Sequence, residues 1–545
     1  ERERERERMD EALYRCCASD DLCALKELLT RGASLTAQLP LCDGDRDPHG
    51  STRGRRWWTC AHVAARHDSV KVMTFLAKSR SLLSTRDPQG RLPIHVGAQF
   101  GSLSCLQAML SSRNCNHNEP SGMNETPLMF SAAFGHAEIV EFLLQQKAEV
   151  HARRMKSSCT AAHMAARNGH HDCLLLLLQA GADPSACRVN GFSVLHDACC
   201  GRCCPECISL LLEWGAVLGE DKDGRTPLHV LCAWSGGMKT RHALSQDAVH
   251  GGHCKSPASS GRSTARSFAS QGSQHRRRSV VPTAEEVAVG LLLKAGVDVD
   301  KKDKLLRSAL HYAAISGSAA VVHALSKHRP HCDFDSQDNS GATPLQLASL
   351  HQNIEVLSAL CALDASVKTL DHDGRSALHY AVMSGSVVVA ELLLNLTAVS
   401  IDHPDCFGAT ALHLAVSLRN PSMEECLLNR KAEIMAAEVQ HLFTPLHLAV
   451  INDDKESVYT LVEIASSRWS PHLFAEYFRM RYGYEPDVSQ MTELSRDTKS
   501  PMYKNDSTTR YRKELILEHH DRHGRSPLLL ASILGSENAL AALPD

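Results

Sequence analysis

Five cysteines between residues 199 and 207 are the first side chains in this sequence whose types and spacing could do chemistry. They lie close to His196 and contain two C-x-x-C spacings, the spacing with which thiolates ligate zinc. The group consists of Cys199, Cys200, Cys203, Cys204 and Cys207. The alternative is structural, because Cys199 and Cys207 occupy apolar positions where one expected helix turns into the next. Cys203 and Cys204 would then be exposed thiols, sensitive to oxidation or to electrophiles.

Histidine is also abundant, with 31 residues, and invites the same metal hypothesis. Nine of them, however, recur at one position of a repeated four-residue signal, which favours a structural role. These are His62, His95, His163, His196, His229, His311, His379, His413 and His447. Two smaller groups remain in expected turns, His328 with His331 and Cys332, and His519 with His520 and His523. We expect no metal and no cofactor at any of these places.

The sequence contains none of the common catalytic motifs. It has no G-x-x-x-x-G-K-[ST] phosphate loop, no H-E-x-x-H helix, no G-x-S-x-G elbow and no G-x-G-x-x-G dinucleotide turn. We therefore expect no enzyme in this segment. A net charge of -3 with 22% charged residues gives no bias toward nucleic acid. No apolar run reaches the roughly 18 residues of a membrane helix, so no membrane contact is expected from this segment.

The elements that carry these residues follow from a repeated helix-start signal, complete in Thr226-Pro227-Leu228-His229 and Thr444-Pro445-Leu446-His447. The first residue of each copy marks the repeat. The markers are Thr59, Leu92, Thr126, Thr160, Ser193, Thr226, Ser308, Thr343, Ser376, Thr410, Thr444 and Ser526. Successive markers are 33 to 35 residues apart, except for two gaps of 82.

Each repeat reads as two helices. Ser or Thr caps the first helix and Pro suits its first turn. Small residues such as Ala165-Ala166 let neighbouring helices approach, and a glycine such as Gly135 ends the helix in a left-handed conformation. An apolar second helix follows, for example Ile139 to Leu144, and a polar D-x-x-G turn such as Asp221 to Gly224 closes the unit.

A period near 33 residues with T-P-L-H-x-A at its core resembles the ankyrin repeat family. The resemblance implies an all-α solenoid of about 12 to 13 helix-turn-helix repeats joined by β-hairpin-like turns. It also implies that the recurrent histidine hydrogen-bonds to backbone across repeats. Each repeat would contact only its neighbours, so no compact domain of 545 residues is needed.

The expected organisation has eight parts. They are a Glu-Arg leader at 1–8, a divergent capping repeat at 9–38, a loop insertion at 39–58, repeats at 59–234, a basic Ser-rich insertion at 235–284, repeats at 285–467, an aromatic, partly helical insertion at 468–520 and a truncated repeat at 521–545. The strict alternation before Met9 is what a translated GA tract gives, so Met9 is our candidate start; a short helical leader is the alternative. We expect the parent chain to continue past Asp545, because terminal repeats need a polar outer face.

The insertion at 235–284 has the composition of a disordered segment. Within it, Arg276-Arg277-Arg278-Ser279 resembles the substrate motif of basophilic kinases, which makes Ser279 a candidate phosphorylation site. The arginines could instead bind an acidic partner or direct nuclear import, and a plain solvated linker is the further alternative.

The other two insertions differ in character. In 39–58, Asp43, Asp45 and Asp47 resemble the start of a calcium loop but lack its bidentate Glu, so a solvated loop is expected. In 468–520, apolar and aromatic residues share one face of an expected helix that either packs on the repeats or docks a partner. Those residues are Leu473, Phe474, Tyr477 and Phe478.

Arginine directly precedes the repeat marker at five turns. The positions are Arg91, Arg225, Arg307, Arg375 and Arg525. The resemblance implies a groove lined by turns and first helices that recognises other proteins. Arginine favours carboxylates, so an acidic peptide is a candidate ligand. The alternative is that these arginines only satisfy acids in neighbouring turns.

Two functions follow as hypotheses. The first is an intracellular adaptor or scaffold that binds other proteins through its groove; 21 cysteines without a signal peptide favour a reducing, cytoplasmic setting, with the nucleus as a further possibility. The second is the cytoplasmic N-terminal part of an ankyrin-type transient receptor potential channel. Residues 521 to 531 and Thr444 to Trp469 are similar in sequence to that family.

Overall fold

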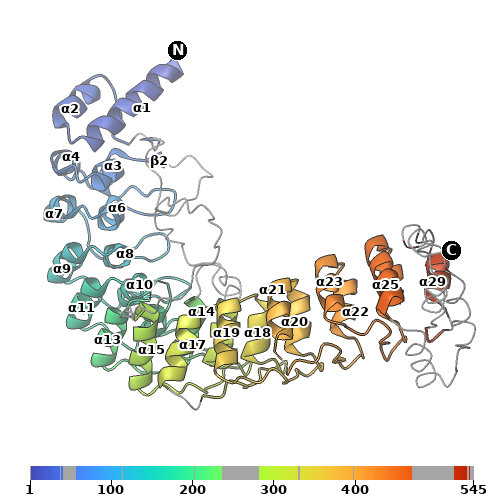
Figure 1. The fold of residues 1–545 in the computed structure, drawn as a ribbon. Coiled ribbons are helices and arrows are strands. Elements are labelled where there is room, and N and C mark those ends of the chain that lie inside the picture. Colours follow the sequence, from blue (N-terminus) through green and yellow to red (C-terminus); the bar gives the residue numbers. More distant parts are fainter. Residues whose placement is uncertain are drawn as a thin grey trace, which may run out of the picture. The chain divides into compact units, whose positions relative to one another are not determined.

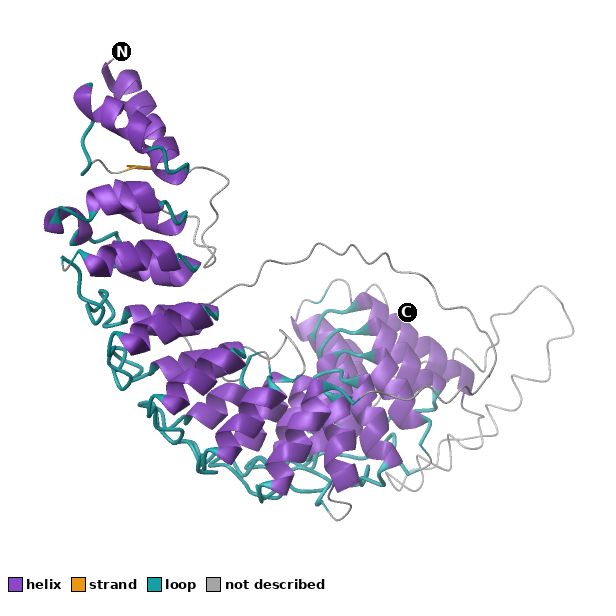
Figure 2. Ribbon diagram, turned by 90° about the vertical axis from the view of Figure 1, so that its left-hand side faces the viewer, coloured by secondary structure: helices purple, strands orange, loops and turns teal. Residues whose placement is uncertain are grey.

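The computed structural model describes residues 2–36, 39–40, 57–112, 114–201, 203–235, 282–328, 332–396, 398–468, 521–523, 525–534, 536 and 539. The chain divides into two units. The first comprises Glu1–Lys304 with His323–Pro330, and the second Leu305–Val322 with His331–Asp545. Both consist of helices, and the one strand pair in the described ranges belongs to the first unit (Figure 2).

In the first unit, pairs of short antiparallel helices follow one another along the chain (Figure 1). The pairs are α1 (Arg2–Ala18) and α2 (Leu22–Thr30), α3 (Cys60–Arg66) and α4 (Val70–Leu76), α6 (Pro93–Phe100) and α7 (Leu103–Ser111), α8 (Pro127–Phe134) and α9 (Ala137–Gln145), α10 (Ala161–Asn168) and α11 (His171–Gln179), α12 (Val194–Cys199) and α13 (Pro205–Glu213), and α14 (Pro227–Trp234) and α15 (Ala284–Lys294). A short helix, α5 (Arg80–Leu83), follows α4.

The second unit repeats the plan. Its elements are α16 (Ala309–Ser316), α18 (Pro344–Leu350) and α19 (Ile354–Ala362), α20 (Ala377–Ser384) and α21 (Val387–Leu394), α22 (Ala411–Ser417) and α23 (Pro421–Asn429), α24 (Pro445–Ile451) and α25 (Lys455–Arg468), and α29 (Pro527–Leu534). Helix α17 (Ala319–His328) follows α16, and its residues from His323 onward belong to the first unit.

Two layers arise in each unit because each helix has one apolar face. In the first unit, the first helices α3, α6, α8 and α10 lie side by side, and the second helices such as α9 and α11 form the other layer (Figure 1). Between the layers, Leu128 of α8 packs in a core with Ile139, Val140 and Leu143 of α9, all buried. The predicted all-α repeat architecture is confirmed.

The predicted helix boundaries follow from local chemistry. Thr126 has extended backbone at the start of α8, and its side chain accepts a hydrogen bond from the N–H of Met129. The same helix ends at Gly135, whose φ of 83° is in the left-handed region. Ten further markers occupy the same N-terminal position. They are Thr59, Leu92, Thr160, Ser193, Thr226, Ser308, Thr343, Ser376, Thr410 and Thr444.

Turns between repeats are joined by single backbone hydrogen bonds. The N–H of Met155 donates to the carbonyl of Met123 at 2.9 Å in the first unit, and Val439 donates to Phe407 at 2.8 Å in the second. Each turn therefore aligns its neighbour, which fixes the spacing of the helices behind it. The expected loop at 39–58 begins and ends in a short antiparallel pair, β1 (Leu39–Pro40) with β2 (Trp57–Trp58).

Candidate functional site

The recurrent histidines join consecutive repeats. In α12, the N–H of Ser193 lies 3.2 Å from Nδ1 of His196, so this nitrogen accepts and the proton resides on Nε2. Nε2 then donates to the carbonyl of Arg225 in the next turn at 3.0 Å. The bond across repeats recurs at His62, His95, His311, His379, His413 and His447. The structural role implied by the ankyrin resemblance is confirmed at these positions.

Burial keeps these imidazoles neutral. Desolvation lowers the pKa of His62 and of His95 to about 4, and that of His163 to about 3. Hydrogen bonds to backbone carbonyls act in the opposite direction but are weaker. A neutral imidazole can accept at Nδ1 and donate at Nε2 at the same time, whereas an imidazolium cannot accept. Protonation at Nδ1 would therefore break the bond accepted within the repeat and place a charge in the core, whereas Nε2 could still donate to the next turn.

One repeat reaches the same geometry without histidine. Gln346 of α18 accepts from the N–H of Thr343 through Oε1 at 2.8 Å, and its Nε2 donates to the carbonyl of Arg375 at 3.0 Å. The carboxamide thus reproduces both histidine bonds. It has no group that titrates between pH 4 and 8.

The five turn arginines are all paired with acids of the turns. Arg91 is almost fully buried, with Nε 2.8 Å from Oδ2 of Asp87. Arg225 and Arg525 repeat that pairing with Asp221 and Asp521 at 2.7 Å. Arg375 lies 2.9 Å from Asp373, and Arg307 lies 3.4 Å from Asp338. These ion pairs agree with the alternative interpretation, in which the arginines satisfy acids of the turns.

The five arginines differ in how much of their side chain is exposed to solvent. The side chain of Arg91 is 5% exposed, whereas Arg307, Arg375 and Arg525 retain 28 to 30%. Binding of an acidic peptide by the arginines stays a prediction, and it would fall to these three more exposed members.

The cysteine cluster is mostly interior. Cys199, Cys200 and Cys207 are buried, as expected for apolar core positions at Cys199 and Cys207. Cys203 and Cys204 are half-buried, so the expectation that they are exposed needs correction. Burial raises the pKa of the Cys203 thiol to about 12, and nearby acids such as Glu285 act in the same direction. That environment favours the unreactive thiol.

Within the part of the chain that the structure describes, no group of three or more His, Cys, Asp or Glu side chains could hold a metal ion. Reactivity at Cys204, whose thiol donates to a carboxylate oxygen of Glu206 at 3.2 Å, stays a prediction. The candidate phosphorylation site Ser279, the calcium-like acids and the aromatic helix of the third insertion lie outside the described residues.

The first helices of the second unit expose apolar side chains at or next to the same repeat position. Met383 of α20, Ile451 of α24 and Ile533 of α29 are seven residues after their markers, and Leu418 follows α22. They are 41, 39, 59 and 52% exposed, respectively. Because α20, α22, α24 and α29 lie side by side, these residues form one strip, which we call the apolar strip.

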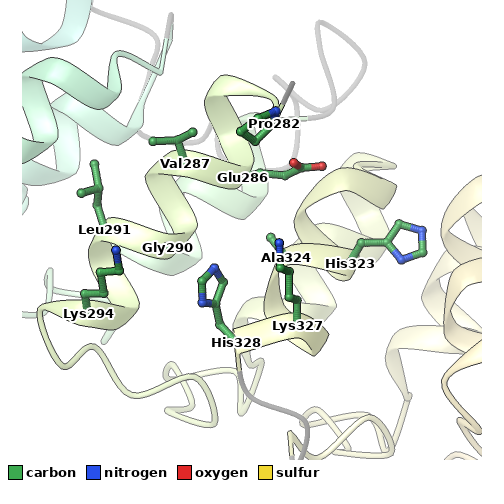
Figure 3. A pocket seen from close by; sticks show the side chains of 10 residues that line it. All are labelled: Pro282, Glu286, Val287, Gly290, Leu291, Lys294, His323, Ala324, Lys327 and His328. Atoms are coloured by element: carbon green, nitrogen blue, oxygen red, sulfur yellow. The ribbon is translucent and has the colours of Figure 1, made fainter. Parts of the chain in front are cut away.

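The first unit contains a hollow of about 500 Å³ between α15 and the C-terminal half of α17 (Figure 3). Gly290 and Ala324 form part of its lining, and Lys294, Lys327 and His328 surround it. This hollow was not predicted from the sequence. A glycine inside an apolar helix was the available signal, because glycine disfavours helix interiors.

Two buried charges were also missed. Glu424 of α23 is 1% exposed and accepts from the hydroxyl of Ser457 in α25 at 2.8 Å, and burial raises its pKa to about 7. Asp197 is equally buried and pairs with Arg188. Glu424 occupies a second-helix position that is apolar in other repeats, such as Val140, and that comparison could have revealed it.

A family model described as ankyrin repeats (3 copies) matches residues 110–187, 283–371, 310–405 and 363–438. The helix pairs, the capped signal and the histidine bonds agree with this match, so the fold is that of ankyrin repeats.

Three relatives illustrate the similarity. Human neurogenic locus notch homolog protein 2 is 35% identical over 103 residues, which are 19% of this chain and 4% of that protein. Human inversin is 32% identical over 125 residues, 22% of this chain and 12% of inversin. The zebrafish putative palmitoyltransferase ZDHHC13 is 30% identical over 178 residues, 32% of this chain and 27% of that protein. The matches thus span about a quarter or less of these relatives.

Among the described helices, none combines the length and the apolar character that a bilayer crossing requires.

Proposed function

We propose that this chain is a scaffold that binds other proteins through the groove side of its repeats, where the first helices and turns lie. The apolar strip of the second unit carries the proposal. Exposed large apolar side chains on one surface mark interaction sites in soluble proteins. Here Met383, Ile451 and Ile533 lie on first helices and Leu418 directly follows a fourth. Because these helices lie side by side, one partner could contact all four residues.

The buried scaffold supports the same reading. The recurrent histidines and the more buried arginines are already committed to bonds between or within turns, for example His413 to the carbonyl of Phe443 at 3.1 Å. Side chains that hold repeats together are unavailable for a ligand. Recognition therefore falls to exposed surface positions, among which the apolar strip offers four large apolar side chains.

The setting we propose is the cytoplasm. None of the 19 cysteines that the structure describes forms a disulfide, which suits a reducing compartment. We expect no catalysis by the repeats, and the palmitoyltransferase name belongs to a relative of which only 27% is matched. The channel alternative rests on the sequence resemblance alone.

The test compares two pairs of charge insertions in the full chain. Met383→Glu with Ile451→Glu places acids in the apolar strip, whereas Val388→Glu with Tyr459→Glu places them on second helices at positions of 52 and 58% exposure. Proteins captured by affinity purification with chemical cross-linking should be lost with the first pair and kept with the second. Equal loss with both pairs would contradict the proposal, and unchanged unfolding midpoints would show that the variants remain folded.

A further inference from the structure

The hollow between α15 and α17 exists because small residues replace larger ones. Gly290 occupies the position held by Glu141, Leu175 and Ser209 in the preceding second helices, and Ala324 the position of Phe142 and Leu176. Gly290 is part of the regular helix α15, so no turn requires it. A Cβ atom at Gly290 would lie 3.2 Å from Nε2 of His328, which shows how closely this ring approaches the helix.

The surroundings of the hollow are basic. Lys294, His323, Lys327 and His328 line it and are exposed, and the ring of His328 lies between α15 and α17 (Figure 3). The acid at the site is Glu286, whose carboxylate accepts from the N–H of Thr283 at 3.3 Å and is thereby held at the start of α15.

The three second helices that precede this pair are not basic at the corresponding position. The positions that correspond to Lys294 in α9, α11 and α13 are Gln145, Gln179 and Glu213. The lining also includes the apolar side chains of Val287 and Leu291. Apolar lining with exposed cations around it is complementary to a ligand that is apolar in the middle and anionic at both ends.

We propose that this hollow binds an acidic peptide segment of a partner protein, with one apolar side chain in the hollow between α15 and α17 and carboxylates at Lys294 and Lys327. These two lysines come from neighbouring helices, whose axes pack about 8–10 Å apart. An extended chain rises about 3.3 Å per residue, so acids about three residues apart reach both lysines. The site lies on second helices and is separate from the apolar strip.

The test is fluorescence anisotropy of the full chain with three labelled peptides. The first combines glutamate with a central leucine, the second replaces the leucine by serine, and the third replaces glutamate by lysine. We expect the first to bind most tightly and the third not at all. Lys294→Glu with Lys327→Glu should weaken binding of the first peptide by about tenfold or more.

Matched variants distinguish binding at the hollow from an effect of the overall charge of the protein. Lys71→Glu with Lys78→Glu makes the same charge change on exposed lysines elsewhere in the first unit and should leave the affinity within about twofold. Gly290→Leu fills the hollow and should weaken binding, whereas Gly290→Ala leaves most of it open and should not.

Three results would overturn the proposal. Equal affinity for the leucine and serine peptides, or for a single-stranded oligonucleotide, would show a surface that attracts any polyanion. Equal weakening by the control lysine pair would show that net charge is responsible. No binding of the first peptide would leave the hollow without this ligand class. Because none of these variants touches the apolar strip, failure here and failure of the scaffold proposal are distinguishable.

Discussion

Replacing three buried histidines by glutamine should make the first unit resistant to mild acid. The substitutions are His62→Gln, His95→Gln and His163→Gln. Gln346 shows that glutamine fits this repeat position and can make the bond across repeats that His62 and His95 make, with contacts of 2.8 and 3.0 Å. The triple variant should therefore be about as stable as the parent chain at pH 7.5. The two proteins should differ only where histidine titrates.

The sign follows from the lowered pKa values. In the unfolded chain a histidine titrates near pH 6.5, whereas burial lowers the pKa to about 4 at His62 and His95 and to about 3 at His163. Between these values the unfolded state binds protons that the folded state does not. The three neutral histidines therefore leave the free energy of unfolding unchanged above pH 6.5, and they lower it as the pH falls toward 4.

The magnitude at pH 5 follows from the same pKa values. Each histidine then costs the folded state about 2 kcal/mol relative to neutral pH, and the three together about 6 kcal/mol. Whole domains are stable by only about 5–15 kcal/mol, so the loss should be large in the parent chain.

Urea denaturation followed by circular dichroism at pH 7.5 and pH 5 measures this directly, because the midpoint multiplied by the slope gives the free energy of unfolding. His151→Gln serves as the control, since His151 is exposed. An equal loss of stability between the two pH values in the parent chain and in the triple variant would refute the reasoning.

Three further predictions use the same denaturation assay. Asp87→Ala removes the partner of buried Arg91 and should cost about 3–5 kcal/mol, whereas Asp373→Ala at a half-exposed pair should cost no more than about 1 kcal/mol. Glu424→Gln should stabilise the second unit by about 3 kcal/mol at pH 8 and hardly at pH 4, because a raised carboxyl pKa lowers folded-state stability as the pH rises from about 4.5 to 7. Gln346→His should add acid sensitivity without loss at pH 7.5, and an unchanged pH profile would contradict the histidine argument.

Helix starts could be read from the sequence because their causes are local. Ser or Thr at the marker accepts a bond from an N–H three residues later, as Thr343 does from Gln346, and proline fits the first turn without a donor. Both effects depend on residues within one turn of helix. The period then places every copy, so the fold class followed from the sequence alone.

Pairing of the turn arginines could not be decided in the same way. Asp at the fourth position before the arginine is present at Arg91 and at Arg375, yet the pairs differ. The hydroxyl of Tyr380 donates to Oδ2 of Asp371 at 2.7 Å, and Arg375 pairs instead with Asp373. Which acid pairs with the arginine thus depends on a helix side chain that is nine residues further along the chain than Asp371. The sequence left the two readings open for that reason.

The surfaces proposed for binding arise where a repeat departs from its neighbours. In a stack each repeat contacts only the next, so a substitution such as Gly290 or Ile451 changes the local surface without requiring changes elsewhere. A repeated position therefore provides its own reference: Gly290 is meaningful because Leu175 and Ser209 stand at the equivalent places. The physical cost supports this comparison, since a helical glycine or an exposed isoleucine gives no stability to the fold. Residues that match the repeat pattern hold the stack together. Residues that depart from it at a cost in folding stability mark the places where we expect a ligand to bind.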